Sequence, residues 1–326
     1  MTVTVTRLRK RYGSTVAVDD LSFKLEPGVV TGFLGPNGSG KSTTMRLMLE
    51  LDHGEGRTLW DGKRIREYPH VSRVVGAHLD ARFFNPNRTA RAHLRMMAAD
   101  AGVSDRRVDE VIGMVGLQSV AKKRPKGFSM GMAQRLGLAG ALLAEPRVLL
   151  LDEPANGLDP QSIQWLRDLL RYYASTGKIV FVSSHLLSEM QVMAERLVVI
   201  TRGSLLAEED LTTFVGRSTR NDVLVRSADR DGLARALRAA GLSPVEEGAD
   251  GLAITGCETE QIGDVAFRSG IGLRELTKRT ASLEEAFLEL TSGAQDYVTQ
   301  SAPGSGASRA GAPGPGASGP EAGGAR

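Results

Sequence analysis

The chain has 326 residues, 41% of them hydrophobic and 24% charged, which is enough for two folded units with substantial cores. Its net charge of +3 is too small to indicate a nucleic-acid partner, and its single cysteine, Cys257, excludes an internal disulfide and fits a reducing, cytosolic compartment. The sequence contains neither the apolar core of a signal peptide nor a run of eighteen apolar residues, so we expect no membrane span of its own.

The first elements along the chain are strands. Residues 2–8 alternate between polar and apolar types and predict one strand, and residues 17–25 predict a second. The turn between them contains Tyr12, which is either a base-stacking ring or a partly exposed turn residue. The apolar run 29–34 then predicts a buried strand.

A glycine-rich loop follows this buried strand and precedes a helical pattern at residues 43–50. The loop fits G-x-x-x-x-G-K-[ST], the pattern of phosphate-binding loops. Glycines permit backbone angles that turn successive N–H groups toward one phosphate-binding concavity. Lys41 is expected to reach the β- and γ-phosphates, and the Ser42 hydroxyl to ligate Mg²⁺. The complete loop consists of Gly35, Pro36, Asn37, Gly38, Ser39, Gly40, Lys41 and Ser42.

The middle of the chain predicts further strands and a group of helices. The strand-forming segments are residues 58–65, around the hairpin signal Asp61-Gly62, and residues 74–79, which lead to Asp80. Apolar residues at helical spacing predict helices over residues 89–101, 105–116 and 129–144. Thr89 and Ser129 are the expected caps of the first and the last of these helices.

Two carboxylates come directly after the next apolar strand, residues 148–151. In open α/β sheets ligands bind at this carboxyl end of the strands. Asp152 is therefore expected to hold Mg²⁺, and Glu153 is the candidate general base for an attacking water. Asp159 precedes the next helix, and His185 ends the following strand, where it can contact a γ-phosphate. Alternating strands and helices of this kind predict a mostly parallel α/β core.

The pattern changes after residue 203. Short strands and helices alternate up to about residue 291, and a Gly-, Ala-, Ser- and Pro-rich stretch that cannot bury enough apolar surface to order itself follows. The predicted units are a nucleotide-binding domain at 1–215 with a helical subdomain at about 85–145, a small α+β domain at 216–292 and a flexible tail at 293–326.

Taken together, these motifs resemble the ATP-binding subunit of an ABC transporter over roughly residues 3–206. The loop at 35–42 matches the Walker A motif, residues 149–153 match Walker B, and residues 156–159 match the D-loop. His185 matches the switch histidine, and Tyr12 lies where the family has its adenine-stacking aromatic residue. The resemblance implies a P-loop cassette in which a mostly parallel central sheet is joined by an antiparallel β subdomain and a helical subdomain.

The resemblance also implies the ligands, ATP and Mg²⁺, and a set of site residues. Glu153 and His185 would be catalytic, and Asp159 would belong to the D-loop. ATP would be bound by Tyr12, by residues 35–42 and by Thr43. The metal would be held by Ser42, Asp80 and Asp152.

Two segments depart from the family pattern. The segment around Ser129 and Gly131 stands in the place of the LSGGQ signature and carries the bulkier Met130 and Met132. In the family, this signature caps the γ-phosphate of the ATP bound to the opposite subunit. Asp80 stands where the family usually has the Q-loop glutamine. An acid at this position, together with a C-terminal segment at 282–288, is similar to the exporters of antibiotics and lantibiotics.

The resemblance therefore implies an ATPase that dimerises and powers the export of a drug or antibiotic through a separate transmembrane permease. Such a subunit is peripheral, on the cytoplasmic face of the membrane, and confers antibiotic resistance. The alternatives are the ATPase of an importer, a non-transport ABC protein that acts on ribosomes, and a cassette that binds ATP only as a structural switch.

Overall fold

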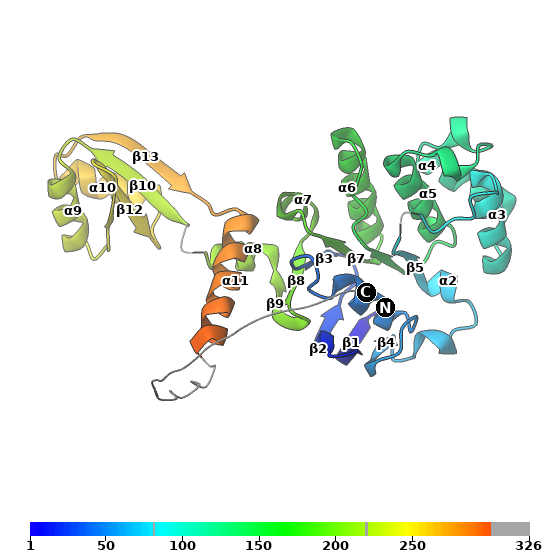
Figure 1. The fold of residues 1–326 in the computed structure, drawn as a ribbon. Coiled ribbons are helices and arrows are strands. Elements are labelled where there is room, and N and C mark those ends of the chain that lie inside the picture. The colour runs from blue at the N-terminus through cyan, green and yellow to red at the C-terminus, as the bar shows by residue number, and fades with distance from the viewer. Residues whose placement is uncertain (81, 219–220, 301–326) are drawn as a thin grey trace, which may run out of the picture.

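The computed structural model describes residues 1–80, 82–218 and 221–300. Within them the chain forms a six-stranded sheet, a three-stranded sheet and a four-stranded sheet with helices packed around them (Figure 1). The architecture is therefore mixed α/β, as the sequence predicts. Residues 301–326 of the expected tail, 293–326, lie outside the described residues.

The six-stranded sheet is the centre of the molecule. Five neighbouring strands run parallel, and the edge strand β9 is antiparallel to β8. The parallel strands are the apolar runs of the sequence, because strands buried on both faces have no solvent-facing side to make polar. In spatial order the strands are β5 (Val75–His78), β6 (Val148–Leu151), β7 (Ile179–Ser184), β3 (Val30–Leu34), β8 (Arg196–Thr201) and β9 (Ser204–Asp210).

The three-stranded antiparallel sheet packs on one face of the central sheet together with α1 (Lys41–Met48). Aromatic rings join the two sheets: Phe23 stacks on Phe181, which stacks on Phe33, at centroid distances of 5.5 and 4.9 Å. The strands, in spatial order, are β2 (Thr15–Leu25), β1 (Val3–Tyr12) and β4 (Glu55–Trp60).

The hairpin predicted at residues 58–65 forms at its turn, where Trp60 and Lys63 exchange backbone hydrogen bonds, but its second strand is absent from the described residues. β4 pairs with β1 instead, and beyond the turn at Asp61-Gly62 only an isolated bridge joins Trp60 to Lys63. The chain then continues into short helical segments. These are η1 (Ile65–Glu67) and α2 (Val71–Val74).

Helices on the other side of the central sheet share its second apolar core, some packed on the strands and some on neighbouring helices (Figure 1). They are α3 (Ala90–Ala101), α4 (Asp105–Met114), α5 (Met130–Leu142), α6 (Pro160–Ser175) and α7 (Leu187–Met193), with the short η2 (Gln118–Val120) and η3 (Pro125–Gly127) between α4 and α5. Thr89 and Ser129 cap α3 and α5 as predicted, because their hydroxyls accept the N–H groups of Ala92 and Met132.

The four-stranded sheet builds a separate unit with its own apolar core. Its chain order is β-α-β-β-α-β, and every neighbouring pair of strands is antiparallel. After α8 (Leu211–Gly216), the elements are β10 (Asp222–Ser227), α9 (Arg230–Ala239), β11 (Val245–Glu247), β12 (Gly251–Thr255), α10 (Thr259–Arg268) and β13 (Leu273–Arg279).

The last helix, α11 (Leu283–Gln300), lies beside α8 between the four-stranded unit and the central sheet (Figure 1). Its first turns belong to the core of the central sheet, through the buried Leu283 and Ala286. The helix continues past residue 292, where the sequence predicts that the tail begins. Among the described residues, no helix has the length and apolarity needed to cross a bilayer.

Candidate nucleotide site

The predicted phosphate-binding loop lies between β3 and α1, at the carboxyl end of the central sheet. Gly38 and Gly40 have positive φ angles of 80° and 105°, which other residues adopt at a cost. A Cβ on Gly40 would also lie 2.3 Å from the carbonyl oxygen of Ala17. The glycine at position 40 is therefore required by both the backbone angle and the packing, and it allows α1 to begin directly after the loop.

Lys41 is buried, with 7% of its surface exposed. Its Nζ donates to the carbonyl oxygen of Gly35 over 2.7 Å, and it lies 3.8 Å from Oε1 of Glu153. Burial lowers the pKa of Lys41, while the nearby carboxylates of Glu153 and Asp152 act in the opposite direction. The site thus holds a cation next to an excess of carboxylates, and phosphate oxygens would give this cation a further partner.

Asp152 and Glu153 follow β6, and their side chains have different partners. Asp152 Oδ1 accepts the hydroxyl of Ser183 over 2.5 Å. Glu153 has a positive φ of 49°, and its Oε2 lies 2.8 Å from Nδ1 of His185 and 3.3 Å from the backbone nitrogen of that residue. The structure therefore brings Lys41, Glu153 and His185 together, as expected for a base, its partner and a phosphate-binding cation.

The three proposed metal ligands lie on one cavity of about 360 Å³, which Ser42, Asp80 and Asp152 line together. Their hydroxyl and carboxylate oxygens are the donors that Mg²⁺ prefers. Within the described residues, no group of three His, Cys, Asp or Glu side chains is arranged to hold a metal alone. The set therefore fits a metal that takes its remaining ligands from phosphate and water, as Mg²⁺ does in nucleotide sites.

Three buried residues support the site and were not identified from the sequence. Ser183 accepts the N–H of Glu153 over 2.9 Å while donating to Asp152. Gln134 donates to the carbonyl oxygen of Glu153 over 3.2 Å, and its Oε1 contacts Nε2 of His78. Ser183 lies two residues before His185, and Gln134 follows the signature segment by three residues. The sequence signal that could have identified these supporting residues is their closeness to the site motifs along the chain.

Other predicted residues have hydrogen-bond partners outside the loop. Tyr12 is 50% exposed at the end of β1, and its hydroxyl donates to Asp52 over 3.1 Å. Asp159 caps α6 by accepting the N–H of Ser162 over 2.8 Å. Ser129 and Gly131 lie at the start of α5, and no hydrogen bond or ion pair of the described residues joins them to the phosphate loop.

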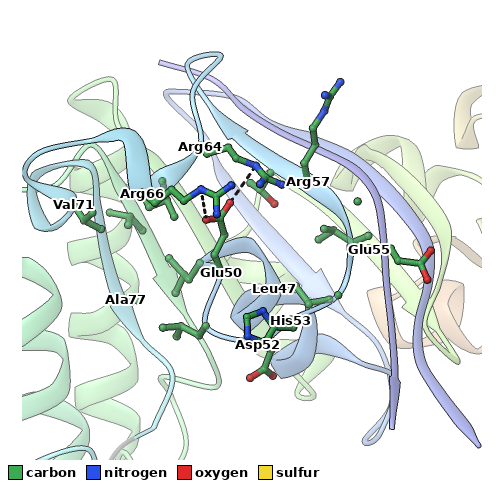
Figure 2. A pocket seen from close by; sticks show the side chains of 18 residues that line it. Leu47, Glu50, Asp52, His53, Glu55, Arg57, Arg64, Arg66, Val71 and Ala77 are labelled. Atoms are coloured by element: carbon green, nitrogen blue, oxygen red, sulfur yellow. Dashed lines mark ion pairs between the residues drawn. The ribbon is translucent and has the colours of Figure 1, made fainter. Parts of the chain in front are cut away.

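A cavity of about 680 Å³ opens at the end of α1, between β4 and the short helices η1 and α2 (Figure 2). Glu50 forms ion pairs there with Arg64 at 3.4 Å and Arg66 at 3.6 Å. None of the predicted site residues lines this cavity. It is therefore separate from the phosphate loop and from the carboxylates.

Comparisons with known proteins agree with this geometry. Residues 18–156 match the ABC transporter family, and residues 221–284 match a domain of unknown function, DUF8746. The chain is 35% identical to the uncharacterized ABC transporter ATP-binding protein YhcH of Bacillus subtilis, over 88% of this chain and 94% of that protein. It is 33% identical to the bacitracin transport ATP-binding protein BcrA of Bacillus licheniformis, over 89% and 97% of the two chains.

Solved structures with this fold include an ATP-binding subunit of an ABC transporter, at a TM-score of 0.60 and 25% identity, covering 66% of this chain and 92% of the other. A dimeric ATP-binding cassette bound to ADP and Pi has a TM-score of 0.57 at 24% identity, and the match covers 64% of this chain and 98% of the other. Fold and site together define a nucleotide-binding ATPase of the ABC class. The chain belongs to the family of ABC transporter ATP-binding proteins.

Proposed function

We propose that this chain hydrolyses ATP to drive the export of an antibiotic-like compound through a separate membrane permease. The observation that carries the catalytic part is the position of Glu153 between Lys41 and His185. The substrate class rests on relatives named for antibiotics: BcrA of Bacillus licheniformis, and the lantibiotic transport ATP-binding protein SrtF of Streptococcus pyogenes. SrtF is 33% identical over 63% of this chain and 90% of that protein.

In this proposal Glu153 accepts the proton of the water that attacks the γ-phosphate. His185 orients the Glu153 carboxylate and contacts the γ-phosphate, while Lys41 and the loop N–H groups stabilise the charge that develops on it. Ser42, Asp80 and Asp152 would hold Mg²⁺, which when bound neutralises phosphate charge. Tyr12 would stack on the adenine, and Pro36, Asn37, Ser39 and Thr43 would complete the ATP-binding segment.

The proposed assembly is a dimer of two cassettes. The signature residues Ser129 and Gly131, and Asp159 of the D-loop, would reach the ATP bound to the partner copy. Two observations support this arrangement: no hydrogen bond or ion pair among the described residues joins Ser129 or Gly131 to the phosphate loop of their own chain, and Ser129 caps the start of α5. Helix N-termini of this kind bind anions. The permease partner would place the dimer on the cytoplasmic face of the membrane.

The catalytic role of Glu153 is tested with the variant Glu153→Gln. Loss of a general base typically lowers a rate by about 10²–10⁴-fold, so we expect kcat for phosphate release to fall by at least about 10²-fold while ATP still binds. Glu195→Gln, an exposed acid, is the matched control. Unchanged turnover of Glu153→Gln would remove Glu153 from the base role.

The transport role is tested by identifying the membrane protein that co-purifies with the chain, and by measuring ATP-dependent movement of peptide antibiotics in vesicles that contain both. We expect an exporter-type permease and outward transport. Co-purification with an uptake permease and a solute-binding protein would instead identify an importer, whereas ATP-dependent sedimentation with ribosomes would identify a non-transport ABC protein.

A further inference from the structure

The helix α11 links the four-stranded unit to the core of the cassette. The helix start is fixed by Ser282, whose hydroxyl accepts the N–H of Glu285 over 3.2 Å while its own N–H donates to Oε2 of Glu285 over 2.9 Å. The N–H of Leu283 donates to Oε1 of Gln191 on α7 over 3.0 Å, and the Leu283 side chain is completely buried. The first turn of α11 is thus anchored on α7.

This anchoring brings Phe287 to the nucleotide site. The ring lines a cavity of about 230 Å³, and the other lining residues come from two segments of the site. Gly35, Pro36 and Asn37 belong to the phosphate loop. Ser184 ends β7, His185 lies in the following turn, and Leu187 begins α7. Phe287 lies four residues after Leu283 and so shares its helix face, which explains why an anchored Leu283 directs the ring toward this turn.

The turn that carries His185 is exposed at residues 185 and 186. The His185 side chain is held by Glu153, and the next residue, Leu186, is largely exposed. An aromatic ring supplies many weak dispersion contacts, and a void in its place would forfeit them. As one wall of this cavity, the Phe287 ring limits the space into which the turn, and with it His185, can move.

We propose that Phe287 is a positioning residue for ATP hydrolysis: its ring forms one wall of the cavity beside the phosphate loop and the turn that carries His185, and so keeps this histidine against Glu153. The inference rests on the proposed function of Glu153 and His185. It also makes the C-terminal unit a regulator of the site, because coupling of this kind is reciprocal. A partner that displaces α11 would slow hydrolysis, and nucleotide binding would strengthen the docking of α11.

The test compares steady-state ATPase kinetics of the full-length chain with those of the variants Phe287→Leu, Phe287→Val and Phe287→Ala. Small misplacements of catalytic groups lower rates by up to about 10²-fold, so we expect kcat to fall about tenfold in Phe287→Ala with KM for ATP unchanged within about twofold. Phe287→Leu should retain most of the activity. The matched control is Leu288→Ala, which removes an exposed neighbour on the same helix.

Hydrogen exchange of the nucleotide-free protein provides a second readout that does not depend on catalysis. The backbone amide of His185, which donates to Glu153, should exchange faster in Phe287→Ala than in Leu288→Ala, whereas amides of the strand β1 should not change. If the alanine variant does not fold, kcat is compared among the wild type, Phe287→Leu and Phe287→Val. A kcat that falls in that order supports the positioning role of Phe287, and equal values contradict it.

Equal kcat in Phe287→Ala and Leu288→Ala would overturn the proposal, as would equal exchange of the His185 amide in the two variants. A loss confined to KM would assign Phe287 to nucleotide binding and would also overturn it. A wild-type chain without ATPase activity would contradict the proposed function, and the exchange comparison would still decide whether Phe287 holds the turn.

Discussion

Ser183 holds the two acidic residues of the site in different directions. It is completely buried at the end of β7, where its hydroxyl donates to Asp152 and accepts the N–H of Glu153. The Asp152 carboxylate thereby lies on the cavity that Ser42 and Asp80 line, while the Glu153 carboxylate lies against Lys41 and His185. One hydroxyl thus separates the proposed metal ligand from the proposed base.

We expect Ser183→Ala to lower kcat by about tenfold or more, because the Asp152 carboxylate and the backbone N–H of Glu153 both lose the hydroxyl that fixes their positions. The buried N–H of Glu153 would also lose its acceptor, which costs about 1–3 kcal/mol of the free energy of unfolding. ATPase kinetics and denaturant unfolding measure the two effects. The exposed Ser188→Ala is the control, and a Ser183→Ala protein with the kinetics of this control would contradict the role of Ser183.

Much of the site was predictable at the level of residues because its motifs are local in sequence. The loop at 35–42 is continuous, and Asp152 and Glu153 directly follow an apolar run. The supporting residues were not predictable in this way. Gln134 contacts His78 across 56 residues of sequence, and that contact depends on how α5 packs against β5.

The contact between β5 and α5 is close enough to require glycine. A Cβ on Gly76 would lie 1.9 Å from the carbonyl oxygen of Ala141 on α5, and both are backbone positions that cannot rotate away. The end of β5 carries His78 and, two residues later, Asp80. The spacing between strand and helix therefore also sets the position of one proposed metal ligand.

We expect Gly76→Ala to lower the free energy of unfolding by about 1–3 kcal/mol, the usual cost of overpacking, and to weaken Mg²⁺-dependent ATP binding because Asp80 moves with the strand. Thermal unfolding and nucleotide titration measure these effects. Gly127→Ala is the matched control, since nothing lies within 4 Å of the added Cβ. A Gly76→Ala protein as stable as this control would contradict the packing argument.

Arg279 on β13 joins two carboxylates of the four-stranded unit. Its guanidinium donates twice to Asp222 over 2.7 Å and twice to Glu247 over 2.6 Å. The hydrogen bonds from Arg279 lower the pKa of Glu247 below its ordinary value of 4.5. A carboxyl whose pKa is lower in the folded state stabilises the fold above that ordinary value.

The stability supplied by Glu247 should therefore be present at neutral pH and be lost as the pH falls below 4.5 toward the lowered pKa. We expect Arg279→Gln to lower the free energy of unfolding at pH 7. The free energy of unfolding of this variant should also fall less between pH 7 and pH 4 than that of the wild type. Denaturant unfolding at pH 7 and pH 4 measures the difference. The control is Arg268→Gln, which removes an exposed ion pair, and parallel pH curves for wild type and Arg279→Gln would refute the expectation.

At the level of elements, the sequence predicted strands and capped helices where the signal was local. The prediction from sequence failed where the partner strand lay far away in the chain. The hairpin predicted around Asp61-Gly62 forms only its turn, and β4 takes β1 as its partner strand, which joins Val3 to Trp60. A turn signal shows that the chain reverses, but the choice of partner strand follows from burial in the whole sheet.

At the scale of the whole molecule, the signature at the start of α5 and the phosphate loop belong to different parts of the cassette. A site that needs both, as the proposed dimer does, must combine two copies. We expect the Glu153→Gln protein to dimerise when ATP and Mg²⁺ are added, because it binds ATP without consuming it.

Analytical ultracentrifugation measures this dimerisation. Ser129→Arg should prevent the dimer without weakening ATP binding by the single chain, since the large cation would occupy the contact surface. Ser104→Arg is the matched control, because Ser104 is another exposed helix cap. A monomeric Glu153→Gln protein at saturating ATP, or a dimer that tolerates Ser129→Arg, would contradict the proposed assembly.

The relation of the C-terminal unit to the cassette was not predictable from the sequence. The alternation of short strands and helices was predictable, but the strand β11, the strand order β11-β12-β10-β13 and the return of α11 to α7 depend on contacts between distant segments. The pattern of apolar residues in α11 indicates a buried face without indicating what covers it. The position of Phe287 beside the phosphate loop therefore required the structure.

The order of strands in the central sheet has a consequence for synthesis on the ribosome. β3, which precedes the phosphate loop, has its neighbours β7 and β8 far downstream, and Val30 pairs with Val180. At about 5–20 residues translated per second, the nascent strand waits roughly 8 to 30 seconds for its first neighbour. During that interval an unpaired apolar segment leaves the exit tunnel. We therefore expect chaperones to bind mainly the N-terminal part of the nascent chain.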